Sequence, residues 1–233
     1  MIAAWRYLRS APAPVRGLAF LAAAAFVTFV PMLGDRWAYD AMFSPRVYDQ
    51  DWARLLRLMG WYPTWMLAAL AILLAGRAGG AACAPGEEVG PRARGAAAWS
   101  AGARSLYMLL APAVSGIACE VLKLVIRRQR PEVHAGAYGF RPWSDQPFST
   151  AGLATPSSHA MVAFAAATAL ARLFPGARWL WYALAAGCAI TRVMAHAHFV
   201  SDVALGALLG WALGWATLAA MRRSETKGPG VIA

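Results

Sequence analysis

The sequence predicts an all-α protein, specifically a six-span transmembrane helical bundle, and three observations support this fold class. Of the 233 residues, 60% are hydrophobic and only 14% are charged, which argues against a disordered chain and against an ordinary soluble domain. Six apolar stretches follow one another along the chain, and the shorter ones carry polar residues at one end. The whole chain, residues 1–233, is therefore interpreted as a single integral-membrane domain.

Three of the apolar stretches contain no charged residue and are long enough to cross a hydrocarbon core of about 30 Å. They occupy residues 17–34, 58–76 and 203–221, and each predicts a transmembrane helix. A basic N-terminal stretch precedes the first of them, as it would in a signal peptide. The apolar run is long, however, and no clear small-residue cleavage site follows it, so we expect an uncleaved first span.

The other three stretches, at residues 105–119, 160–171 and 179–191, are too short to span a membrane unless polar residues extend them. The first continues through Glu120 and Lys123, the second begins near Pro156, and the third runs past Arg192 toward His198. Charged groups at membrane depth are costly and usually face the interior of a bundle. These polar ends therefore predict a functional site.

The charge pattern predicts which side of the membrane holds that site. With six spans, the polar ends of spans three to six share one face, and the opposite face carries both termini and 12 of the 22 Lys and Arg. The positive-inside rule then places the termini in the cytoplasm and the site at the periplasmic face of a bacterial-type inner membrane. We expect a cytoplasmic loop at residues 77–95, an outer loop at 125–155 and a short helix in the outer interface at 51–59.

The first polar cluster contains Lys123, Arg127 and Arg130, which recur at helical spacing until Pro131 ends the helix. Guanidinium groups match phosphate oxygens in pairs, so cations on one helical face indicate an anion site. The alternative is a basic juxtamembrane segment that contacts anionic lipid headgroups.

The second cluster runs from Thr155 to His159. Thr155 is expected to cap a helix that has Pro156 in its first position, so that the following amides point out of the helix start as an anion site. Without further evidence, this pattern is equally typical of an ordinary capped helix.

The third cluster contains Arg192, His198 and Asp202. Asp202 follows His198 by four residues, close enough to accept a proton from one ring nitrogen and leave the other as a nucleophile or base. His196 and His198 do not share a helical face, so a metal bound between them is not expected. The three cysteines are far apart in the sequence and indicate neither a disulfide framework nor a metal site.

Taken in order, the patterns Lys-x6-Arg-Pro, Pro-Ser-Ser-His and Arg-x5-His-x3-Asp resemble the three-part signature of the type-2 phosphatidic acid phosphatase superfamily, the membrane lipid phosphate phosphatases. The resemblance covers about residues 105–220. It has two departures: Ser158 stands where the family usually has Gly, and Thr191 stands where the third motif usually opens with Ser.

The resemblance implies a role for each motif residue. His198 would be the nucleophile that forms a phosphohistidine, Asp202 would orient its ring, and His159 would be the general acid. The residues that would hold the phosphoryl group are Lys123, Arg130, Ser157, Ser158 and Arg192. No metal and no cofactor is implied, and the expected partners are membrane lipids rather than nucleic acid.

The expected function is therefore hydrolysis of a lipid phosphate or diphosphate, such as undecaprenyl diphosphate, lipid A, phosphatidylglycerol phosphate or phosphatidic acid. Arg127, Arg128 and Arg141 add positive charge to the outer loop, which indicates a polyanionic headgroup or, alternatively, binding of bulk anionic lipid. Three alternative functions remain: a lipid phosphotransferase of the same family, a transporter, and a membrane cytochrome with histidine ligands.

Overall fold

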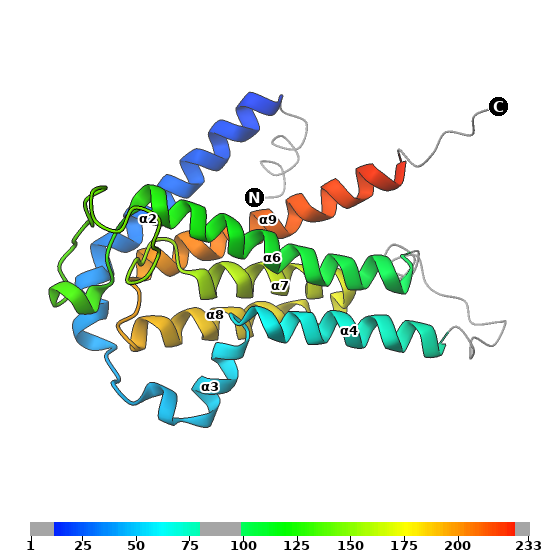
Figure 1. The fold of residues 1–233 in the computed structure, drawn as a ribbon, viewed down its shortest axis with the longest axis horizontal. Coiled ribbons are helices and arrows are strands. Elements are labelled where there is room, and N and C mark those ends of the chain that lie inside the picture. Colours follow the sequence, from blue (N-terminus) through cyan, green and yellow to red (C-terminus); the bar gives the residue numbers. More distant parts are fainter. Residues whose placement is uncertain (1–11, 80–98, 227–233) are drawn as a thin grey trace.

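The computed structural model describes residues 12–79 and 99–226, and these residues form helices joined by turns and loops (Figure 1). The long helices are α2 (Ala13–Ala41), α4 (Tyr62–Gly79), α6 (Ala101–Ile126), α7 (Ser158–Leu173), α8 (Arg178–Met194) and α9 (Val200–Thr226). The shorter ones are α3 (Asp51–Leu58) and the 3-10 turns η1 (Val47–Asp49), η2 (Pro131–His134) and η3 (Pro175–Ala177). In the described part of the chain there is no β-strand, only two isolated β-bridges in the loop after α6.

Five of the six predicted apolar stretches are helical throughout. The stretch predicted at 58–76 is helical only from Tyr62, because residues 59–61 form the bend between α3 and α4, and the short helix predicted at 51–59 ends at Leu58. Three helices, α2, α6 and α9, are long and apolar enough to cross a membrane. A fourth candidate arises if α3 and α4, which meet at an angle of 67°, are one broken span. The predicted loop at 77–95 and the basic N-terminal stretch fall largely outside the described residues.

Helix α7 lies at the centre of the bundle, where it packs against α6, α8 and α9. Most of its alanines are fully buried, which allows close approach of its neighbours. On α9, the backbone of Gly210 faces this helix so closely that a Cβ atom there would lie 2.2 Å from the carbonyl oxygen of Met161. The close contact between α7 and α9 sets the position of the start of α9, which carries Asp202, against the start of α7.

Helix α2 contacts the rest of the protein mainly through α9, and its first half diverges from the bundle in Figure 1. Large apolar side chains on it are exposed, among them Leu18, Phe26 and Leu33. A soluble protein rarely leaves so many apolar side chains uncovered, so this surface fits contact with lipid. At its other end, however, α2 buries Asp35 inside the protein.

Two further predicted helix ends are wrong. Helix α6 ends at Ile126, and Arg127 adopts a left-handed backbone conformation with φ of 58°, so Lys123, Arg127 and Arg130 do not share a helical face. Helix α7 begins only at Ser158, and its cap is Ser157, whose side chain accepts a hydrogen bond from the amide of Ala160. Thr155 does not cap the helix, because it lies two residues before the cap and its hydroxyl donates to Asp202.

Candidate active site

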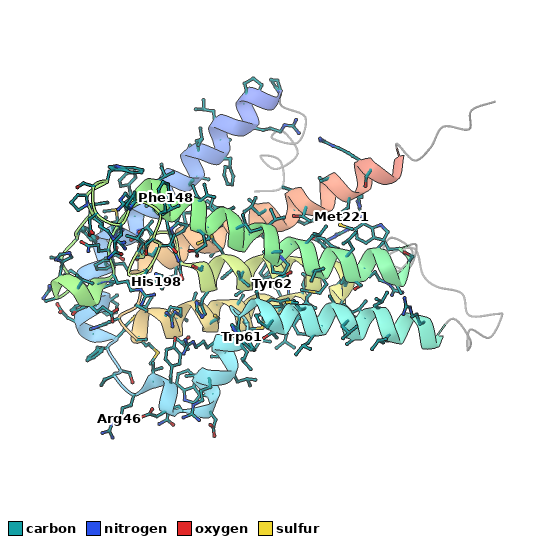
Figure 2. The ribbon with its side chains drawn as sticks, viewed as in Figure 1. Arg46, Trp61, Tyr62, Phe148, His198 and Met221 are labelled. Carbon is teal, nitrogen blue, oxygen red and sulfur yellow. The ribbon has the colours of Figure 1, made fainter. Side chains whose placement is uncertain are left out.

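The three polar clusters meet at one end of the helix bundle. Lys123 on α6 donates a hydrogen bond to the hydroxyl of Ser158 at the start of α7. The amide of the fully buried Ser157 donates to the carbonyl oxygen of Asp202 at 3.1 Å, which joins the second cluster to the third. Figure 2 shows His198 at this end of the bundle and Met221 at the opposite end.

His198 lies in the connection between α8 and α9 and is almost fully buried. Its Nδ1 atom is 3.9 Å from Oδ2 of Asp202, which is too long for a hydrogen bond, and it has no other partner. The same Oδ2 atom accepts a hydrogen bond from the amide of Phe199 at 2.8 Å. Asp202 thus reaches back to the residue before α9, as in a capping box, and this contact fixes its carboxylate beside the imidazole.

The second carboxylate oxygen of Asp202 has its own partners. The hydroxyl of Thr155 donates to it, and a terminal nitrogen of Arg128 lies 3.5 Å away. Thr155 therefore supports the orientation of Asp202, instead of the helix start that the sequence indicated.

Arg128 belongs to a buried network behind Asp202. Its guanidinium group donates to the hydroxyl of Ser201 at 3.1 Å and to Asp35 at 3.2 Å. Asp35 in turn accepts the amide of Ser201 at 2.9 Å. Asp35 is not among the site residues expected from the sequence, although a carboxylate at the end of a long apolar helix is a recognisable signal.

The expectation that Arg127, Arg128 and Arg141 present extra positive charge to a headgroup disagrees with this structure. All three residues are buried. The guanidinium group of Arg127 donates to the carbonyl oxygens of Arg141, Pro142, Asp145 and Pro147. Arg141 donates to the side chain of Gln146 and to the carbonyl oxygens of Ser149 and Ala151. Because oxygen atoms of the protein already accept hydrogen bonds from Arg127 and Arg141, these two side chains hold the loop after α6 together.

Three other cations surround His198. Arg192 is buried, donates to the hydroxyl of Tyr48 at 2.9 Å and has a buried Nε atom without a partner. The Nε atom of Arg130 is likewise buried and unpartnered. Burial first, and then the positive charges of Arg192, Lys123 and Arg130, hold the pKa of His198 well below its ordinary value. The imidazole is therefore neutral at physiological pH.

His159 is the second residue of α7 and is half-buried. Gly60, in the bend between α3 and α4, packs directly against it: a Cβ atom at Gly60 would lie 2.6 Å from the Cβ atom of His159. No sequence pattern indicated this contact. Lys123, Arg130 and Arg192 also interact electrostatically with His159, so both histidines face the same group of cations.

His196 is held by aromatic residues instead. Its ring stacks on Tyr39 and Phe43 at centroid distances of 3.7 and 3.9 Å. Its Nε2 atom forms a hydrogen bond with the carbonyl oxygen of Tyr39. Within residues 12–79 and 99–226, no group of three or more His, Cys, Asp or Glu is arranged to hold a metal ion. What the cluster offers is a neutral imidazole beside a carboxylate, a second imidazole, and cations that can bind an oxyanion.

Comparison with known proteins agrees with this chemistry. A lipid A 1-phosphatase of Rhizobium etli is 38% identical to the chain over 114 residues, which are 48% of this chain and 47% of that protein. A lipid A 1-phosphatase of Rhizobium johnstonii is 38% identical over 106 residues, 45% of this chain and 42% of that protein. The chain thus matches less than half the length of these curated relatives.

No solved structure gives a significant match. The family model described as the PAP2 superfamily matches residues 104–225, which include all three polar clusters. Because this match covers more than half of the sequence, and because the resemblance of its three motifs points the same way, the chain belongs to the PAP2 superfamily.

Proposed function

We propose that this protein is a lipid phosphatase that hydrolyses a phosphate or diphosphate monoester of a membrane lipid through a phosphohistidine at His198. The observation that carries the proposal is the buried imidazole of His198, which lies beside the carboxylate of Asp202 and interacts electrostatically with three cations. An oxyanion is the ligand that such a group of cations binds best. A nucleophile beside that ligand suits group transfer.

In the first step, the Nε2 atom of His198 attacks phosphorus while the bond from phosphorus to the lipid oxygen breaks. The carboxylate of Asp202 accepts a hydrogen bond from the N–H group at Nδ1 and balances the positive charge that the ring acquires. The distance between Nδ1 of His198 and Oδ2 of Asp202 is 3.9 Å, and catalytic hydrogen bonds commonly shorten when the substrate binds.

His159 donates a proton to the departing lipid oxygen, because an alkoxide is a poor leaving group. Water then attacks the phosphorus of the phosphohistidine, the bond from phosphorus to Nε2 breaks and returns the free imidazole of His198, and His159 takes up the proton that the water loses. The products are the lipid alcohol and inorganic phosphate.

Lys123, Arg130 and Arg192 stabilise the charge on the phosphoryl oxygens in both steps, together with the amides at the start of α7. These groups supply the charge that a metal ion supplies in many phosphoryl-transfer enzymes. We therefore propose that the reaction is independent of metal.

The proposed placement has six spans, with α7 and α8 completing the set, both termini in the cytoplasm and the site at the periplasmic face. Exposed aromatic side chains of the loop after α6 support an interfacial position, because aromatic residues concentrate at the membrane surface. They are Phe140, Trp143 and Phe148, and Phe148 is 90% exposed at the end of the bundle that holds His198 (Figure 2).

The first substrate to test is lipid A carrying its 1-phosphate, because both relatives have the name lipid A 1-phosphatase. Purified protein in neutral detergent would be assayed for release of inorganic phosphate from lipid A, undecaprenyl diphosphate, phosphatidylglycerol phosphate and phosphatidic acid. We expect release that survives excess chelator, is inhibited by orthovanadate and is absent from the His198→Asn variant. Absence of release from all four lipids, or the same release from His198→Asn, would contradict the proposal.

A further inference from the structure

Glu120 lies one helical turn before Lys123 on α6 and forms a closed arrangement with it and with Ser158. The Oε1 atom of Glu120 is 3.0 Å from the ammonium nitrogen of Lys123. The same oxygen accepts a hydrogen bond from the hydroxyl of Ser158 at 2.9 Å, and Lys123 donates to that hydroxyl. All three groups therefore contact one another.

The number of hydrogens decides which way these bonds run. A hydroxyl carries one hydrogen, and that of Ser158 points to Glu120, so its oxygen accepts from Lys123. No hydroxyl hydrogen is left for a phosphoryl oxygen. The expected phosphate-binding role of Ser158 thus does not extend to its hydroxyl, although its backbone amide is unaffected. Lys123 has three ammonium hydrogens. It donates one to Glu120 and one to Ser158, which leaves one for the substrate.

Lys123 is buried, whereas its partner Glu120 is partly exposed. The lysine side chain is 8% exposed, whereas that of Glu120 is 45% exposed at the rim of the site. A lysine side chain is long and flexible, and substrate binding is weakened if it must order that chain. A partner on each side holds the ammonium group in place before the phosphate arrives.

We propose that Glu120 and Ser158 are positioning residues that fix the ammonium group of Lys123 at the phosphate site, an inference that rests on the proposed function. Ser158 replaces the Gly that is usual in the family motif, and a Gly could make neither of the two side-chain bonds. The Ser158 hydroxyl therefore acts together with Glu120 in holding Lys123. The effect of each residue on activity is expected to depend on the presence of the other.

Five single variants, one of them a control, and two double variants test the inference, with phosphate release and orthovanadate inhibition as readouts. Glu120→Ala should lower kcat/KM by about 10- to 100-fold and weaken vanadate inhibition in parallel, since hydrogen bonds to charged groups contribute this much. Ser158→Gly should lower kcat/KM by about 10-fold or more, because the hydroxyl is hydrogen-bonded to two charged groups, Lys123 and Glu120. Lys123→Met should lower it at least as far as Glu120→Ala does.

The double variants separate positioning from direct contact with substrate. In the Lys123→Met background, neither Glu120→Ala nor Ser158→Gly should lower kcat/KM further, because their effects act through the missing ammonium group. Glu120→Gln keeps an acceptor and should recover part of the loss, which also covers the case in which Glu120→Ala fails to fold. Asp51→Ala is the matched control, because it breaks an exposed ion pair with Arg54 on α3 and should change nothing.

Two results would overturn the inference. Losses that persist in the Lys123→Met background would mean that Glu120 or Ser158 contacts the substrate directly. Tighter vanadate inhibition in Glu120→Ala would mean that the carboxylate competes with phosphate for Lys123. Failure of the proposed function looks different, because the wild-type protein would then release no phosphate at all.

Discussion

Replacement of Gly60 by alanine tests whether the bend between α3 and α4 positions His159. A Cβ atom at Gly60 would lie 2.6 Å from Cβ, 2.7 Å from Cα and 2.8 Å from Cδ2 of His159. Carbon atoms make favourable contact only at about 3.5–4.0 Å, so the overlap is about 1 Å. It involves the backbone of His159 as well as its ring, so rotation of the side chain does not relieve it.

The bend or the start of α7 must therefore move by about 1 Å, a displacement that can cost about 100-fold in rate at a catalytic group. We expect Gly60→Ala to lower kcat/KM on a lipid phosphate by this factor and to reduce stability by about 1–3 kcal/mol, as overpacking does. The loss should be smaller on an aryl phosphate, whose leaving group needs little protonation.

The assay is phosphate release by purified protein in detergent, with thermal unfolding measured on the same samples. Gly176→Ala is the matched control, because a Cβ atom there meets nothing within 4 Å. If Gly60→Ala equals Gly176→Ala in activity on the lipid substrate, the close contact does not position His159 and the reasoning is refuted.

Three further predictions concern the acid, the nucleophile and the packing beneath them. His159→Ala should lose most activity on a lipid phosphate and keep more on an aryl phosphate; equal losses on both would exclude its role as general acid. In a histidine-labelled NMR titration, the His198 signal, assigned with His198→Asn, should stay in its neutral form as the pH falls through 6.5, because its pKa is lowered. Lys123→Met should move that titration toward higher pH, and an ordinary titration near pH 6.5 in the wild type would contradict the reasoning. Gly210→Ala should lower the Tm in detergent by an amount equivalent to about 1–3 kcal/mol, since its Cβ would overlap the backbone of α7; Gly17→Ala, in open space on α2, should not.

Sequence reasoning located the helices and the family because both depend on local patterns. Apolar runs that alternate with polar ends predict helices whatever their neighbours are. The three motifs are read from spacing alone, and the family match to residues 104–225 confirms that reading.

The helix ends and the supporting residues could not be predicted in this way, because they depend on tertiary contacts. Arg127 leaves α6 to bind carbonyl oxygens of the following loop, and Thr155 turns to Asp202. Asp35 and Gly60 come from segments that precede the family match, so motif spacing carries no information about them. Only the packing of α2 and of the α3–α4 bend against the site reveals what they contact.

Trapping of the covalent intermediate tests the central claim most directly. Purified protein would be mixed with a lipid phosphate labelled with ³²P, quenched under denaturing alkaline conditions and mapped by mass spectrometry. We expect a phosphate that is stable to alkali and labile to acid on the peptide that contains His198, and none in the His198→Ala variant. Label on another residue, or turnover by purified His198→Ala at the wild-type rate, would contradict the account.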